Sequence, residues 1–171
     1  MEELDRVFVE FSSNKLKQLC SRILECLNRL NAEQIWYRGA SNENAVGNLV
    51  LHLCGNLRQW IGSGVGGKPD IRVRDREFAA RGDISPAELS ERLETTVEDA
   101  VQIISQISSA RLAERISVQK YNVTALEAIF HVVEHFSQHT GQSIFATKAM
   151  TGSDLGFYAH LNAPKHEAKT P

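Results

Sequence analysis

The chain has 171 residues, of which 42% are hydrophobic and 23% are charged, a length and composition that indicate one folded domain and exclude disorder or a coiled-coil rod. Its formal net charge of −2 gives no general attraction for phosphate backbones, so we expect no nucleic-acid partner. No apolar run approaches the roughly 20 residues that a membrane span needs, so we expect no membrane association.

The first two predicted helices are marked by apolar residues spaced three and four positions apart. Residues 3–30 carry one such stripe, formed by Leu16, Leu19, Ile23, Leu27 and Leu30. The second helix follows SNEN, where Ser41 or Asn42 is expected to cap the first turn. It continues through AVGNLVLHLCGNLRQWI to Ile61.

A long connection separates the second predicted helix from the third. It contains the glycine-rich stretch GSGVGGKPD, followed by the charged stretch IRVRDREFAARGD. A loop of this length in a compact bundle often borders a functional site. Its arginines are expected either to bind an anionic substrate or to pair with Asp75 and Glu77.

The third predicted helix has the clearest start signal in the chain. Ser85 lies in the N-cap position, Pro86 takes the first helical position, and Glu88 would complete a capping box. The apolar stripe that follows is formed by Leu89, Leu93, Val97, Val101 and Ile104.

The fourth predicted helix starts at Asn122 or Thr124 and runs to about residue 150, with apolar residues on most sides. No segment shows convincing strand alternation. Four amphipathic helices in a chain of this size predict an all-α fold, an antiparallel four-helix bundle with a long charged loop between its second and third helices. We expect one domain over residues 1–162 and a flexible tail over residues 163–171.

Cysteine usage favours a reducing compartment. Cys20, Cys26 and Cys54 are odd in number and show no CxxC spacing, which is typical of buried thiols. The acidic stretch MEELDRVFVEF lacks a signal-peptide pattern, so we expect a cytoplasmic protein. A homodimer is also expected, because bundles of this size often bury a helical face against a second copy.

Half of the six histidines lie in HVVEHFSQHTGQ, residues 131–142. Helical residues four apart lie about 40° from one another around the axis and about 6 Å apart along it, so His135 and His139 can direct their rings at one ion. His131 adds a further drift of about 40°, which one straight helix would not easily accommodate. A third ligand is expected from His52, which lies mid-helix in LVLHLCGN at the edge of an apolar stripe.

Inward imidazoles either bind a cation or are ordinary core histidines with hydrogen-bond partners. Three neutral imidazoles favour Zn²⁺ or Ni²⁺, with Co²⁺, Fe²⁺ and Mn²⁺ as alternatives, and leave a coordination position for water or substrate. Four amides near these histidines would either orient a substrate or form interhelical hydrogen bonds: Asn48, Asn56, Gln59 and Gln142.

The stretch HVVEHFSQHTGQ and the mid-helix His52 together resemble the signature of the DinB-like superfamily of metal-binding four-helix bundles. SNENAVGNLVLHLCGNLRQWI, GGKPDIRVRDREF and TGSDLGFYAHL resemble one subfamily of unknown function within it, and the resemblance covers about residues 3–162. It implies a divalent metal held by His52, His135 and His139. His131 falls outside this ligand set, either beside a ligand or without a role.

The characterised proteins that the chain resembles include bacillithiol S-transferases and mycothiol-dependent maleylpyruvate isomerases. The resemblance implies a metal-dependent S-transferase that joins a low-molecular-weight thiol to a small electrophilic substrate, or a hydrolase that activates water. The alternative is a non-catalytic bundle whose metal is structural or sensory.

Overall fold

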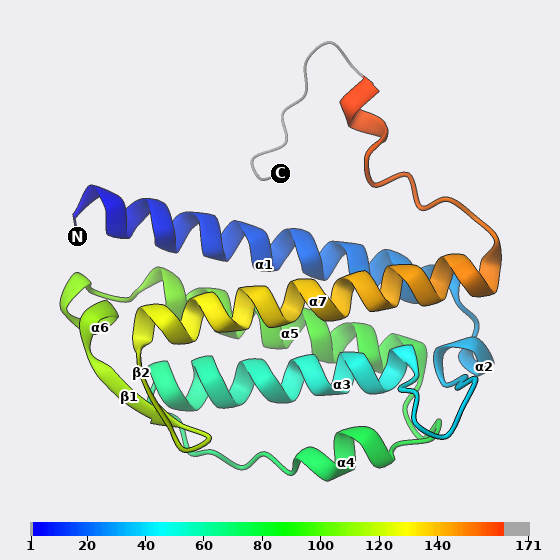
Figure 1. Cartoon of the computed structure of the whole chain (residues 1–171), viewed down its shortest axis with the longest axis horizontal. Coiled ribbons are helices and arrows are strands. Elements are labelled where there is room, and N and C mark those ends of the chain that lie inside the picture. The colour runs from blue at the N-terminus through cyan, green and yellow to red at the C-terminus, as the bar shows by residue number, and fades with distance from the viewer. Residues whose placement is uncertain (1, 163–171) are drawn as a thin grey trace.

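Four long helices form the body of the protein in a computed structural model that describes residues 2–162 (Figure 1). They are α1 (Glu3–Arg29), α3 (Val46–Leu57), α5 (Pro86–Ser105) and α7 (Ala125–Thr151). Helix α1 packs against α5 and α7, and α3 packs against the same two helices. The all-α fold class predicted from the sequence is confirmed, and the four predicted helices correspond to these four.

The helix directions follow from the connections. Figure 1 shows α1 and α7 running one way along the bundle, and α3 and α5 running the other way. The antiparallel pairs are therefore α1 with α5 and α3 with α7, whereas α3 and α5 are parallel neighbours. Because α5 starts beside the start of α3, the chain must return along the whole bundle between them. Residues 66–85 make this return, and we call them the strap.

Helix α3 continues without a break into a wider helical segment, η1 (Arg58–Val65). Its backbone hydrogen bonds join residues five apart instead of the four of an α-helix. The Gly66 amide, for example, donates to the Ile61 carbonyl at 2.8 Å. The second helix was predicted to end at Ile61, and the observed segment extends one turn further. Trp60 lies in this turn, and its side chain is buried.

The helix starts show which cap predictions were right. Ser85 caps α5 by accepting the Glu88 amide at 3.2 Å, as expected, but the Glu88 carboxylate pairs with Arg92 instead of closing a capping box. The predicted caps of the second helix are wrong, because α3 starts after Ala45. There the Asn48 side chain accepts the Ala45 amide at 3.2 Å and takes over the capping role.

A short β-hairpin, which the sequence did not predict, precedes α7. Strands β1 (Arg115–Val118) and β2 (Tyr121–Thr124) pair antiparallel, and the turn residues Gln119 and Lys120 both have positive φ. With four residues each and no Asn-Gly turn, these strands carry little sequence signal. Three short helices and one helical turn complete the described elements: α2 (Ala32–Ile35), α4 (Arg74–Ala79), α6 (Ser109–Ala113) and η2 (Ala159–Asn162).

The core lies between the four long helices and is mostly aliphatic. Phe136, Leu16 and Ile23 are among its fully buried side chains, and burial of each such side chain contributes about 1.5–3 kcal/mol to stability. All three cysteines are buried and free, as the sequence predicted. No described helix is both long and apolar enough to cross a membrane. The tail predicted over residues 163–171 lies outside the described residues.

Candidate metal centre

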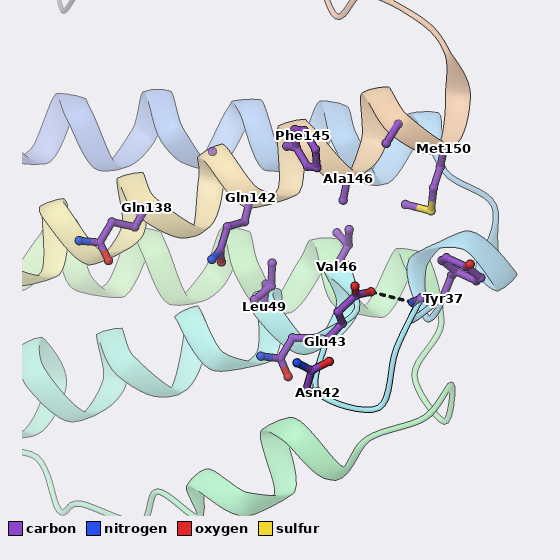
Figure 2. A pocket seen from close by; sticks show the side chains of 14 residues that line it. Tyr37, Asn42, Glu43, Val46, Leu49, Gln138, Gln142, Phe145, Ala146 and Met150 are labelled. Carbon is purple, nitrogen blue, oxygen red and sulfur yellow. Dashed lines mark hydrogen bonds between the residues drawn. The ribbon is translucent and has the colours of Figure 1, made fainter.

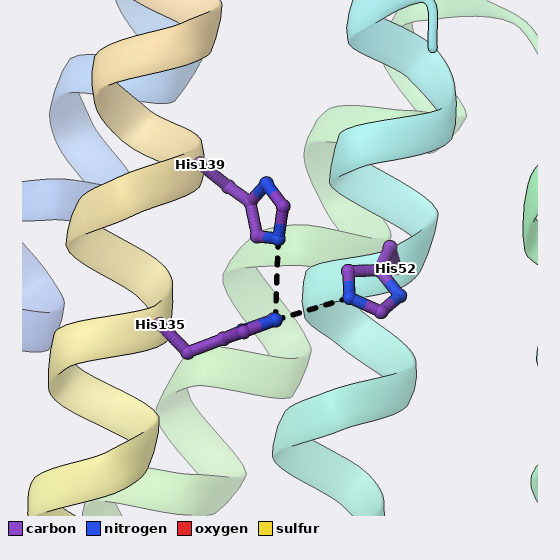
Figure 3. Close-up of side chains that lie close together, drawn as sticks. All are labelled: His52, His135 and His139. Atoms are coloured by element: carbon purple, nitrogen blue, oxygen red, sulfur yellow. Dashed lines mark hydrogen bonds between the residues drawn. The ribbon is translucent and has the colours of Figure 1, made fainter. Parts of the chain in front are cut away.

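Three histidine side chains meet in the groove between α3 and α7 (Figure 3). His52 comes from the middle of α3, and His135 and His139 come from consecutive turns of α7. The Nε2 atom of His135 lies 3.1 Å from Nε2 of His52 and 3.2 Å from Nε2 of His139. Ligand atoms of all three lie within 4.8 Å of one another. The structure thus brings together the three residues that the sequence selected, which we call the histidine trio.

The proton positions in the trio follow from the partners of the outer ring nitrogens. His139 Nδ1 lies 2.6 Å from Oε1 of Gln142, an acceptor, so Nδ1 carries the proton and donates it. His139 Nε2 then presents a lone pair to the centre of the trio. Burial lowers the pKa of His139 despite the opposing effect of this hydrogen bond, so the ring is neutral at pH 7.

The Nδ1 atom of His52 lies between two charged partners. It is 3.0 Å from Oε2 of Glu77, which accepts, and 3.0 Å from Nη2 of Arg72, which donates, so these contacts orient the ring but do not by themselves fix its tautomer. Arg72 also binds the Glu77 carboxylate, with Nε 2.7 Å from Oε1 and Nη2 2.8 Å from Oε2. Burial alone would raise the pKa of Glu77, but hydrogen bonds from Arg72 and His52 outweigh it and lower that pKa.

His135 Nε2 faces the Nε2 atoms of both other rings. Burial, followed by the nearby His139 and His52, lowers the pKa of His135 to about 3, so this ring is also neutral. A single N–H on Nε2 can donate fully to only one of its two neighbours, and His135 Nδ1 is buried without a hydrogen-bond partner among the described residues. A bound cation would instead take a lone pair from each Nε2 atom, with the proton of each neutral ring on Nδ1.

The dimensions and chemistry of the trio suit a divalent transition metal. Two imidazole nitrogens bound to one ion at about 2.1 Å, with bond angles from octahedral to tetrahedral, lie about 3.0–3.4 Å apart. Two of the three separations, 3.1 and 3.2 Å, fall in this range, and the third pair of ligand atoms lies within 4.8 Å. Three imidazole nitrogens match the preference of Zn²⁺ and Ni²⁺ and lack the oxygen atoms that Ca²⁺ and Mg²⁺ require.

Comparison with known proteins places the chain in a family. The family described as "Protein of unknown function (DUF1572)" matches residues 3–166. The chain belongs to the DUF1572 family. No curated protein shows significant similarity to it in sequence.

Solved structures show that this DUF1572 chain has a DinB-like fold. A conserved protein from Enterococcus faecalis superposes with a TM-score of 0.72 at 17% identity, covering 84% of this chain and 97% of its own. A DinB-like protein from Bacillus subtilis, YjoA, superposes with a TM-score of 0.66 at 18% identity, covering 88% of this chain and 96% of its own. At these identities the likeness concerns the fold alone.

His131 lies outside the trio, as the sequence predicted. Its ring packs against Trp60 with centroids 4.3 Å apart, and its centroid is 5.7 Å from that of His135. Burial lowers the pKa of His131, so this DUF1572 chain carries a further neutral imidazole one turn before its trio.

The strap supplies two site residues that sequence reasoning did not assign. Two roles were left open for the arginines of the strap, substrate binding and pairing with an acid. For Arg72 the structure shows pairing, because its side chain is only 4% exposed and forms an ion pair with Glu77. Glu77 lies 25 positions after His52, and no spacing rule connects them. The sequence showed only that this connection is rich in charged residues, and this did not indicate which acid would be buried.

Three of the amides beside the trio form hydrogen bonds within the protein. Asn48 donates to the carbonyl oxygens of Glu77 and Ala80, and Gln59 accepts from Arg72 Nη1 at 2.9 Å, so both fasten the strap to the bundle. Gln142 instead orients His139. Asn56 is buried.

A cavity of about 740 Å³ adjoins the trio in the DUF1572 chain (Figure 2). Its walls are the first turns of α3, the second half of α7 and the segment before α3. Gln142 lines it, and Leu49, three residues before His52, lines the opposite wall. The side chains labelled in Figure 2 are Tyr37, Asn42, Glu43, Val46, Leu49, Gln138, Gln142, Phe145, Ala146 and Met150.

Proposed function

We propose that this protein binds a divalent transition metal through His52, His135 and His139 and is a metal-dependent enzyme, a transferase or a hydrolase, that acts on a small molecule. One observation carries the proposal: three imidazole rings from two helices bring their Nε2 atoms together at one point. A cavity large enough for a small substrate lies beside residues that contact this trio.

The chain's own residues prepare the site for this chemistry. Glu77 and Arg72 orient the ring of His52 through its outer nitrogen, and Gln142 holds the proton of His139 on Nδ1. Arg72 neutralises Glu77, so the site adds no net negative charge to the ligand set. When bound, a divalent ion lowers the pKa of a water or low-molecular-weight thiol attached to it, which serves hydrolysis or S-transfer respectively.

Metal content is the first test of this proposal. Wild-type protein, His135→Ala and His131→Ala should each be incubated with Zn²⁺ or Ni²⁺, desalted and analysed by mass spectrometry for metal. We expect one equivalent in the wild type and in His131→Ala, whose ring lies outside the trio, and loss of metal in His135→Ala. Retention of one equivalent by folded His135→Ala would contradict the assignment.

Turnover is the second test. The fully metallated protein should be assayed with an aryl halide plus a thiol, and separately with an aryl ester in water. Metal-dependent turnover of either class supports an enzyme and separates the transferase from the hydrolase. If both assays fail while His52→Ala lowers the melting temperature sharply, the ion has a structural role and the catalytic part of the proposal is wrong.

A further inference from the structure

The 740 Å³ cavity described above has a distinctive charge pattern. We infer that it is the substrate site, and that it accepts an uncharged or cationic molecule with an aromatic or aliphatic group and rejects anions. That a ligand binds there rests on the cavity itself, and its being the substrate rests on the function proposed above.

The cavity lies next to the trio through shared residues. Gln142 lines the cavity and accepts the hydrogen bond from His139. Leu49 lies just under one helical turn before His52, so the α3 wall also begins within a turn of a ligand. A molecule in the cavity therefore lies beside residues that contact the trio, although none of the three histidines lines the cavity itself.

Charge is what distinguishes this cavity. Glu43 provides its carboxylate, and none of the described residues that line it is a lysine, arginine or histidine. Glu43 Oε2 accepts the backbone amides of Gly39 at 2.8 Å and Ala40 at 3.2 Å, which holds the carboxylate at the cavity wall (Figure 2). No cation pairs with Glu43 among residues 2–162. A bound anion would meet this negative charge without compensation.

The second cavity on α3 shows the opposite pattern. It has a volume of about 320 Å³, lies under the strap, and is lined by Arg58, Arg72, Arg76 and Arg92. Asp70 and Glu77 line this second cavity as well, but its arginines outnumber these acids, whereas Glu43 is the charged residue among those that line the first cavity. The second cavity also neighbours the trio, because its residues Arg72 and Glu77 contact His52 Nδ1 on the outer side of that ring. The arginines of this chain are therefore placed away from the cavity that we assign to the substrate.

Two exposed aromatic rings provide the apolar contact. Tyr37 is 59% exposed and Phe145 is 76% exposed, and both line the cavity (Figure 2). Neither is part of the buried core. Such rings become covered only when a ligand packs against them. The amides of Gln138 and Asn44 on the same walls can orient the polar end of such a ligand.

The inference has a consequence for the thiol co-substrate. Glutathione-like thiols carry carboxylates, and this cavity offers them no cation. A thiol that binds here is instead neutral or carries an amine, as cysteamine does. The carboxylate-free thiol is therefore the one to use in the S-transfer assay.

Three probes with one phenyl ring test the charge rule: phenethylamine, 2-phenylethanol and phenylacetate, which are cationic, neutral and anionic at pH 7. Each should be titrated into the chelator-treated full chain, so that phenylacetate cannot bind a metal. Binding is read from NMR shifts of the Gly141 and Gln142 amides, which report on this cavity and not on the arginine-lined one. We expect phenethylamine and 2-phenylethanol to bind, and phenylacetate to bind at least about tenfold more weakly than phenethylamine.

Two variants connect the binding to this cavity. Phe145→Ala should weaken phenethylamine binding about three- to tenfold, whereas Phe130→Ala should leave it unchanged, because Phe130 is also exposed on α7 but does not line the cavity. Glu43→Gln, which keeps an acceptor oxygen for the loop amides, should remove the preference for the amine over the alcohol.

Equal binding of phenylacetate and phenethylamine would overturn the inference, as would an unchanged affinity in Phe145→Ala. These experiments use protein without metal, so they stand or fall separately from metal binding. The same titrations on His135→Ala should give wild-type affinities, which shows that failure of the metal centre and failure of the cavity are distinguishable outcomes.

Discussion

At the scale of single residues, the main finding is that each outer ligand of the trio has a partner for its second nitrogen. The partner of His52 is a buried carboxylate, and that carboxylate is itself held by a buried guanidinium. This arrangement makes the ligand more basic and fixes its ring orientation before any ion arrives. Glu77 acts through His52, so it is a positioning residue.

Replacing Glu77 by Gln should weaken Zn²⁺ binding about 10- to 100-fold, because it removes the carboxylate that contacts His52 Nδ1 and leaves Arg72 without a counter-charge. Affinity is measured by competition with a chromophoric chelator. The ¹⁵N shifts of His52 in the metal-free variant report the tautomer directly. Asp75→Asn, an exposed change in the same strap, serves as the control and should bind like the wild type.

The trio could be predicted from sequence, because helical spacing alone aligns His135 with His139 and places His52 at the edge of an apolar stripe. Glu77 could not, because its position depends on how the strap docks. In the sequence, Asp75 and Glu77 are equivalent candidates, because both are acids in the same charged stretch. Only the docked backbone distinguishes them, with Glu77 buried and Asp75 exposed.

At the scale of elements, the strap and α3 touch through a position without a side chain. A Cβ at Gly55 would meet the carboxylate of Glu77 and the Nε atom of Arg72, so this ion pair can lie against the helix only where α3 carries glycine. Glycine inside a helix costs about 0.5–1 kcal/mol relative to alanine. At position 55 the close approach of the strap explains why the helix carries glycine despite this cost.

Gly55→Ala should therefore lower the free energy of unfolding by about 1–3 kcal/mol, because the added methyl group displaces the Arg72–Glu77 pair. Gly141→Ala is the matched comparison, since a Cβ there meets nothing within 4 Å. It should raise stability by about 0.5–1 kcal/mol. Urea denaturation of both variants measures the difference, and equal effects would contradict this account.

Sequence patterns predicted the elements in proportion to their length. The 27-residue α1 and α7 and the 20-residue α5 repeat their apolar periodicity often enough to be recognised. The six residues of α4 and the four-residue strands of the hairpin do not. Capping was predicted correctly only where the signal was local, at Ser85, and missed where Asn48 caps from within the helix. For the fourth helix, Thr124 was one of two predicted starts, and it is the residue that caps α7.

At the scale of the whole molecule, three buried thiols connect stability to alkaline pH. Burial raises the pKa of Cys20 to about 12 and that of Cys54 to about 11, and it also raises that of Cys26. The unfolded chain releases these protons above its ordinary thiol pKa of about 8.5, while the folded chain keeps them. Stability is therefore full below about pH 8.5 and falls as the pH rises above it.

The expected slope is up to about 1.4 kcal/mol per pH unit for each thiol that ionises only in the unfolded chain. Urea unfolding between about pH 7.5 and 9, where lysine and tyrosine are still mostly protonated, measures this slope. Cys54→Ala should make the decline shallower, even though the variant loses some packing. An identical slope in this variant would show that Cys54 does not contribute.

The strap is longer than its crossing requires. The 12 residues of α3 and the eight of η1 rise about 30 Å, and an extended chain covers that distance in roughly nine residues, about half of the strap. The remaining slack is coiled into α4, and that coil places Glu77 inward. A bundle joined only by tight turns would have no segment free to do this. Two parallel neighbouring helices require a return connection between them. In this protein the same connection also places the carboxylate of Glu77 beside His52.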